Sequence, residues 1–247
     1  MDGTGGIEVS GAPRVGSRQG MARLAGILYL AFIVVFAVST SVEGKPIVWG
    51  DAAATAKNIA SSEWMFRIGN TGEVVSTLLF LLSAWALYVL LRPVGRNLAL
   101  LFLLLNLAGV AAECACIVIR AGTLELLGRP SSLHAFSPDQ LHDLGMLLLK
   151  VSGSGGVVQT LFYGAWLFPL GYLVFKSGFQ PRFLGVLLLL DGLCMTVCFL
   201  QLSLFPGYEK LTYPTFPIMF IAEFGLAVWL IFKGVREAEK ELPAQQG

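Results

Sequence analysis

Charged residues are scarce in this chain. Asp, Glu, Lys and Arg make up 13% of its 247 residues, about half of the roughly 25% that a soluble domain usually carries. Hydrophobic residues make up 55% of the chain. This balance is typical of a polytopic membrane protein, so the predicted partner is the lipid bilayer. The formal net charge of +1 argues against nucleic acid as a partner.

Cysteine and histidine are also few, which limits the metal chemistry that the chain can support. The four cysteines all lie inside apolar runs: Cys114, Cys116, Cys194 and Cys198. That placement fits neither a secreted disulfide framework nor a zinc ribbon. We therefore interpret them as small buried side chains, and predict no cofactor and no metal.

Several motifs of soluble enzymes are missing from the sequence. It contains no P-loop, no glycine-rich dinucleotide fingerprint and no Gly-x-Ser-x-Gly elbow. The glycine-rich stretch 152–156 lacks the lysine and the preceding strand that a phosphate loop requires. We interpret this stretch as a flexible hinge, and an enzyme is the less favoured class of function.

Six long apolar runs dominate what is present. A helix needs about 20 apolar residues to cross roughly 30 Å of hydrocarbon. The sequence therefore predicts an all-α fold, a six-transmembrane-helix bundle in residues 21–236 with one or two short outer-surface helices. The predicted spans are about 21–42, 66–91, 98–119, 156–176, 183–205 and 216–233, and residues 1–20 and 237–247 are predicted cytoplasmic tails, the first of them disordered.

The stretch 162–190 predicts a membrane hairpin and sets the orientation. Gly178 can end its first helix in a left-handed conformation, and Pro181 suits the start of the next helix. Lys176 and Arg182 flank this turn, so the positive-inside rule places it in the cytoplasm. Six spans then put both termini in the cytoplasm. The first run is long enough to be a retained span, although residues 37–39 loosely resemble a signal-peptide cleavage site.

Two segments outside the spans predict short surface helices. Asp51 stands where an N-cap would, ahead of the alanine-rich stretch 52–60. The stretch 138–151 has a helical pattern, but one helix over 139–175 would be about 55 Å long at 1.5 Å per residue, too long for one crossing. We therefore expect the chain to break at the glycine-rich stretch and the fourth span to start near Gly156.

Ionisable residues inside the spans are the candidate functional residues, because they are costly in a membrane and usually face the bundle interior. Asn70 and Glu73 share one face of the second span, and Glu113 and Arg120 share one face of the third. We predict an outward-facing polar cavity containing Glu73, Glu113, Glu223, Asn70 and Asn106, with Arg67 and Arg120 as counter-charges, and with His142, Asp143 and Asp191 as weaker candidates. A structural network that fixes the helix register is the alternative interpretation.

Five segments spread over most of the chain resemble a known family. They are RLAGILYL beginning at Arg23, GDAAATAKNIASSEWMFRIGN at 50–70, ALYVLLRPVGRNLALL at 86–101, FYGAWLFPLGYLVFKSGFQPRFLGVLLL at 162–189 and AEFGLAVWLIFKGV at 222–235. Over about residues 21–236 the chain resembles the bacterial multi-pass membrane family "domain of unknown function 4386". The resemblance implies a multi-pass protein of the bacterial plasma membrane, and no established activity comes with it.

Three classes of function remain open at this stage. The leading hypothesis is that the protein binds or transports a small or lipidic molecule through the outward-facing polar cavity. The second is a non-catalytic membrane component that acts through protein partners. The third is an intramembrane metal-dependent hydrolase using His134, His142, Asp143 and a membrane glutamate, although such a site usually needs three strong ligands and an open position. The sequence leaves the oligomeric state open.

Overall fold

The computed structural model describes residues 15–128, 135–178, 180–208, 210 and 212–235 of the chain. Its helices are α1 (Val15–Gly44), α2 (Ala52–Ser61), α3 (Glu63–Leu91), α4 (Arg96–Gly128), α5 (Pro138–Lys176), α6 (Arg182–Leu204), the 3-10 helix η3 (Tyr213–Thr215) and α7 (Phe216–Phe232). The described ranges contain no strand, which confirms the predicted all-α class.

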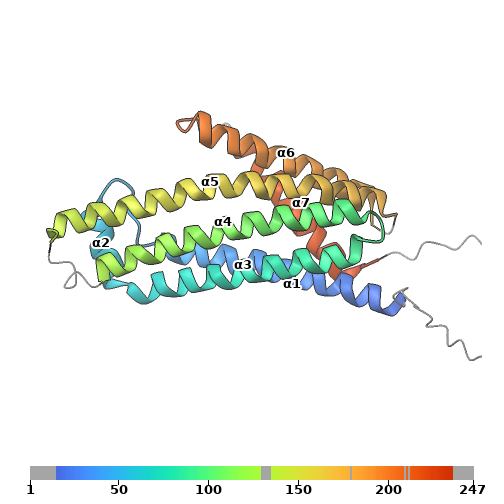
Figure 1. Cartoon of the computed structure of the whole chain (residues 1–247), viewed down its shortest axis with the longest axis horizontal. Coiled ribbons are helices and arrows are strands. Elements are labelled where there is room, and N and C mark those ends of the chain that lie inside the picture. The colour runs from blue at the N-terminus through green and yellow to red at the C-terminus, as the bar shows by residue number, and fades with distance from the viewer. Residues whose placement is uncertain (1–14, 129–134, 179, 209, 211, 236–247) are drawn as a thin grey trace, which may run out of the picture.

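The long helices close into a ring. α1 packs against α3, α3 against α4, α4 against α5, α5 against α6, α6 against α7, and α7 returns to α1. Figure 1 shows α1, α3, α4 and α5 running side by side along the long axis of the molecule. In the described part of the chain, six helices are long and apolar enough to cross a membrane, so the multi-pass membrane fold is confirmed.

The two ends of the bundle differ. α2 lies at one end, while the tight turns after α3 and α5 lie at the other, together with the start of α1 and the end of α7 (Figure 1). At that second end the Gln19 side chain accepts a hydrogen bond from the backbone N–H of Val235 at 2.9 Å. Gly178 adopts a φ of +71° in its turn, the left-handed conformation that the sequence predicted. Both ends of the described chain therefore lie on one side of the bundle, and the compartment they face stays a prediction.

α5 differs from the prediction. The structure has one helix of 39 residues, Pro138–Lys176, where a surface helix, a break at 152–156 and a separate span were expected. Ser137 and Gln140 cap its start reciprocally, with side chain to backbone distances of 2.9 and 3.3 Å. A glycine inside a helix costs only about 1 kcal/mol, and packing along α4 offsets this cost; the Ser152 hydroxyl, for example, donates to the Cys116 carbonyl at 3.1 Å. The predicted break and hinge are wrong, and 156–176 as the membrane-embedded part stays a prediction.

The long α4 and α5 carry a small hydrophobic cluster beyond the main bundle. With 33 and 39 residues, both exceed the roughly 20 residues that one crossing needs. α2 packs on the extra turns, and the Asp51 carboxylate caps α2 by accepting the Ala54 N–H at 2.8 Å, as the sequence predicted. We call these buried residues the α2-end cluster: Ala56, Ile59, Phe66, Leu124, Leu127, Met146 and Leu149.

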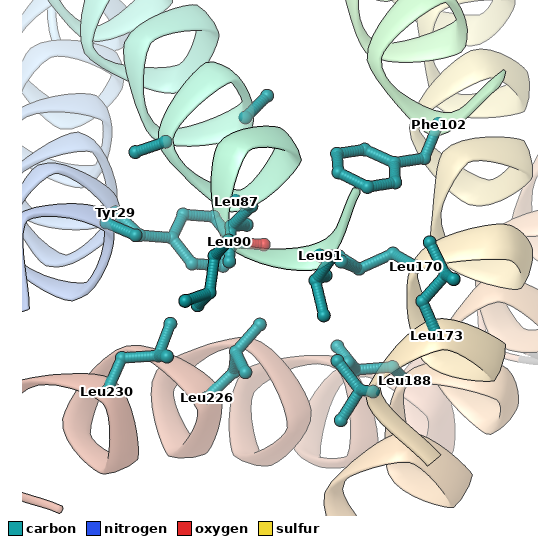
Figure 2. Close-up of a cluster of buried hydrophobic side chains, with 14 of the residues drawn as sticks. Tyr29, Leu87, Leu90, Leu91, Phe102, Leu170, Leu173, Leu188, Leu226 and Leu230 are labelled. Atoms are coloured by element: carbon teal, nitrogen blue, oxygen red, sulfur yellow. The ribbon is translucent and has the colours of Figure 1, made fainter. Parts of the chain in front are cut away.

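The main core fills the other part of the ring. Figure 2 shows leucines of α3, α5, α6 and α7 converging on one space beside Tyr29 of α1. Its largest fully buried side chains include Tyr29, Phe80, Phe102 and Trp166. Because aromatic rings from four helices meet here, the main core fixes how those helices sit against each other.

The continuous α5 leads to a test at its glycines. Replacing Gly156 with Ala is expected to leave the melting temperature of the detergent-purified protein unchanged or higher, because a Cβ there would come no closer than 3.9 Å to another residue. Alanine also favours a helix over glycine by up to about 1 kcal/mol. Gly155→Ala is the contrasting variant, because its Cβ would collide with the Cys116 sulfur and should lower the melting temperature. Destabilisation by Gly156→Ala would instead favour a hinge.

Candidate functional site

Arg120 on α4 binds glutamates from three helices. Its Nη2 donates to the Glu113 Oε1 at 2.9 Å and also contacts the Glu73 carboxylate on α3. Its Nε lies 3.6 Å from the Glu43 Oε1 at the end of α1. We call these four residues the Arg120 cluster. The structure thus brings together Glu73, Glu113 and Arg120, as the sequence analysis expected.

The Arg120 cluster lies between the two hydrophobic cores. Phe66 of the α2-end cluster and Phe80 of the main core lie about two helical turns before and after Glu73 on α3. On α4, the stretch 113–120 is likewise flanked by Val110 of the main core and Leu124 of the α2-end cluster. Glutamates from three helices thus meet in one charged layer between the two cores.

Glu43 reaches the cluster because α1 and α3 approach closely. A Cβ on Gly69 would lie 2.6 Å from the Glu43 Cβ and 2.9 Å from the Glu43 backbone nitrogen, so only glycine fits there. The sequence analysis missed Glu43, because it placed the end of the first span at residue 42, while α1 continues to Gly44. The pair Gly69 and Gly72 on α3 was the available indication of a close helix contact.

A small cavity adjoins the Arg120 cluster. Its volume of about 160 Å³ equals roughly five waters at about 30 Å³ each. Its lining residues are Thr40, Glu43, Gly44, Ile47, Trp49, Glu73, Arg120, Leu149, Ser152 and Gly153. The Glu43 side chain is 4% exposed and interacts with both Arg120 and the Glu73 carboxyl group. Because two glutamates and one arginine line it, this cavity has one more acidic than basic side chain in its wall.

The remaining residues of the predicted cavity take other places. Asn106 is fully buried, and Asn70 is half-buried on the same helix as Glu73. Neither the Asn106 amide nor the Asn70 Oδ1 has a hydrogen-bond partner among the described residues. Arg67 is not a counter-charge of the cluster, because it points away from the Glu73 face and pairs with Glu63 at the surface at 2.6 Å.

The weaker candidates His142 and Asp143 do not join the Arg120 cluster. His142 is half-buried on α5, Asp143 is exposed, and His134 lies outside the described residues. Within the described ranges, no group of three or more His, Cys, Asp or Glu side chains is placed to hold a metal ion. The structure therefore offers no observation in favour of the hydrolase hypothesis.

Glu223 lines a different and larger cavity, so the prediction of a single polar cavity that contains it is wrong. This inner pocket has a volume of about 580 Å³. It is lined by Phe32, Ile33, Phe36, Ala37, Phe80, Gln159, Thr160, Tyr163, Met195, Cys198, Gln201, Leu202, Thr212, Tyr213, Phe216, Met219, Phe220 and Glu223. The ring order explains the separation, because α7 packs on α1 and α6, whereas Glu113 and Arg120 lie on α4.

The walls of the inner pocket are mainly aromatic and aliphatic, with a polar edge where α6 leads to η3. The Gln201 amide donates to the Phe205 carbonyl at 2.9 Å, and the Thr212 hydroxyl donates to the Gln201 Oε1 at 3.5 Å. In Figure 1 the C-terminal end of α6 stands away from the other helices, and the chain then returns to α7. The polar edge therefore joins α6 to the segment that closes the ring.

Asp191 and Tyr29 lie beside Glu223. The Asp191 side chain on α6 is fully buried, and neither of its oxygens accepts a hydrogen bond from the described residues. It interacts electrostatically with Glu223 of α7 and with Tyr29 of α1. The structure thus gives Asp191 an acidic neighbour that the sequence analysis had assigned to another site.

A ring of six membrane-length helices enclosing buried acids defines a multi-pass α-helical membrane protein. The chain belongs to the family described as "Domain of unknown function (DUF4386)", whose family model matches residues 24–234. This match confirms the resemblance found in the sequence.

One relative, which this chain matches over most of the relative's length, is archaeal. It is a protein of Archaeoglobus fulgidus with the description "Uncharacterized protein", and it is 31% identical over 156 residues. The matched region is 63% of this chain and 77% of the relative. No solved structure matches the chain. The comparisons therefore establish the family, and they carry no activity.

Proposed function

We propose that this protein binds a small, mostly apolar or lipidic molecule in the inner pocket. The observation that carries the proposal is the pocket itself, a space of about 580 Å³ lined by residues of α1, α3, α5, α6 and α7. Pockets for small molecules usually measure about 300–1,000 Å³ and combine apolar walls with a few polar groups. The inner pocket has this size and this mixture.

Packing physics supports an occupant. Protein interiors are packed about as densely as organic crystals, and voids larger than a water are few. The inner pocket is far larger than a water, and it lies next to a main core that is filled by aromatic side chains. A bundle that packs its core this tightly and still leaves a large apolar space is well suited to hold a ligand there.

The orientation of the bundle is part of the proposal. Arg92 and Arg96 flank the turn after α3, and Lys176 and Arg182 flank the turn after α5. By the positive-inside rule, this end of the bundle and both termini face the cytoplasm of the plasma membrane. The α2 end, which is nearer to both the Arg120 cluster and the inner pocket, then faces outward, and a ligand would enter from the outside or from the outer half of the bilayer.

Filling the inner pocket tests the proposal. Ala37 lines the pocket, and a Trp in its place would occupy part of the space. We expect wild-type protein, purified in detergent, to carry a co-purifying molecule of defined mass in native mass spectrometry, and Ala37→Trp to lower its occupancy several-fold.

The matched control is Ala111→Trp. Ala111 is an exposed residue of α4 that does not line the inner pocket, so this variant should keep the wild-type occupancy. Bulk lipid alone in every sample, or equal occupancy in both Trp variants, would contradict the proposed function.

A further inference from the structure

The inner pocket has one charged residue in its wall and a second buried acid close behind it. Among its described lining residues, only Glu223 has a charged side chain. Asp191, which does not line the pocket, is fully buried and interacts electrostatically with Glu223, and neither of its carboxylate oxygens has a hydrogen-bond partner among the described residues. Two carboxyl groups, one from α6 and one from α7, thus interact electrostatically at one side of an apolar space.

No basic side chain in the described part of the chain forms an ion pair with either acid. Every ion pair found in the described part of the chain involves Arg67 or Arg120. Described titratable groups that interact electrostatically with one or both acids include Tyr29 from α1, Tyr163 from α5 and Cys194 from α6. Cys198 and Tyr213 line the same pocket as Glu223. Since a buried charge without a partner costs several kcal/mol, neutrality must come from bound protons or from a cation that enters the pocket.

The aromatic walls favour a cation that is itself apolar. The rings of Phe32 and Phe80 stack with centroids 4.3 Å apart, and Tyr163 meets Phe80 edge-on at 4.9 Å. Phe220 lies about one helical turn from Glu223 on α7. Ring faces attract ammonium-type cations and also accept alkyl or aryl groups. Acid and aromatic rings thus line the same space.

We propose that the inner pocket selects lipophilic cations, molecules in which an amine or quaternary ammonium group is attached to an apolar body. The cationic group lies against Glu223, with Asp191 behind it, and the apolar body fills the aromatic part of the pocket. This inference rests on the proposed function and adds the sign of the ligand's charge. It disfavours fatty acids and anionic lipids, because no Lys or Arg is among the described residues that line the pocket.

Two probes of matched shape and opposite charge test the inference on the wild-type protein. Tetraphenylphosphonium is a lipophilic cation, and tetraphenylborate is an anion of almost the same size. Equilibrium dialysis of the detergent-solubilised protein, corrected for binding to empty micelles, should give saturable binding of tetraphenylphosphonium. Tetraphenylborate should bind at least ten-fold more weakly. This comparison requires no variant, so it does not depend on any substitution folding.

Variants then test whether the acid pair is responsible for selecting cations over anions. Glu223→Gln should weaken tetraphenylphosphonium binding at least ten-fold, and Asp191→Asn should weaken it by a smaller factor. Glu125→Gln is the matched control, because Glu125 is an exposed acid on α4 and its loss should change nothing. Melting temperatures identify any variant that fails to fold.

The outcomes separate this inference from the proposed function. Equal binding of both probes, or unchanged tetraphenylphosphonium binding by folded Glu223→Gln, would overturn cation selection while a co-purifying molecule sensitive to Ala37→Trp could still support a ligand pocket. No binding of either probe would overturn cation selection too. If in addition no molecule co-purifies with the wild-type protein, the proposed function fails as well.

Discussion

Replacing Arg120 with Met is expected to remove most of the folded protein from the membrane fraction. The change leaves Glu43, Glu73 and Glu113 clustered without their shared counter-charge. Removing one partner of a buried ion pair costs about 3–5 kcal/mol, a large part of the 5–15 kcal/mol that typically separates folded from unfolded protein. Membrane-fraction abundance, and the melting temperature of whatever protein remains, would measure the loss.

Arg67→Met is the matched control. Arg67 pairs with Glu63 at the surface, and its side chain is 48% exposed. Exposed pairs of this i,i+4 type contribute only about 0.3–0.5 kcal/mol, so abundance should stay near the wild-type level. Equal losses from both Arg variants would contradict the central position of Arg120 in the bundle.

Removing all the charges of the cluster together distinguishes a structural network from a functional site. A variant that combines Arg120→Met with Gln at Glu43, Glu73 and Glu113 leaves no unpaired charge and should regain most of the lost abundance. If this variant also keeps the co-purifying molecule of the inner pocket, the Arg120 cluster acts as a structural network. If it folds and loses that molecule, the cluster takes part in ligand binding.

The sequence predicted features that depend on local chemistry or on the bilayer. The apolar runs had to be helices, because lipid offers the backbone no other hydrogen-bond partner. The Asp51 cap and the left-handed Gly178 also followed from neighbouring residues, and the structure confirms both. Periodicity placed Glu73 on one face of α3 and Glu113 with Arg120 on one face of α4, and these faces do meet.

The features that the sequence could not predict depend on which helices pack together. Periodicity predicts which face of α7 carries Glu223 but does not identify the helix that packs against that face. In the structure α7 packs on α1 and α6 and away from α4. Glu43 was missed for a related reason, because only the contact with Gly69 shows that the end of α1 approaches α3. The stretch 152–156 looked like a break because glycine weakens an isolated helix, whereas packing against α4 keeps α5 continuous.

Trp166→Ala is expected to destabilise the bundle by about 3–5 kcal/mol, the usual cost of truncating a buried Trp. Trp166 is fully buried on α5, and its ring centroid lies 5.1 Å from Phe80, 6.2 Å from Tyr29 and 6.2 Å from Phe102. Helix association in lipid relies on van der Waals packing, so a cavity at the junction of α1, α3, α4 and α5 removes contacts that lipid cannot replace. Unfolding in a titration with a denaturing detergent would measure the effect.

Trp85→Ala is the matched control for the loss of stability expected from Trp166→Ala. Trp85 is 48% exposed on α3, on the outside of the ring, and its truncation should cost well under the loss at Trp166. Because Phe80 contacts Trp166 and also lines the inner pocket, Trp166→Ala should in addition lower the occupancy of the co-purifying molecule, while Trp85→Ala should not. Equal instability of the two variants would mean that the main core does not hold the ring together. Lost stability with unchanged occupancy would mean that the pocket wall does not depend on that core.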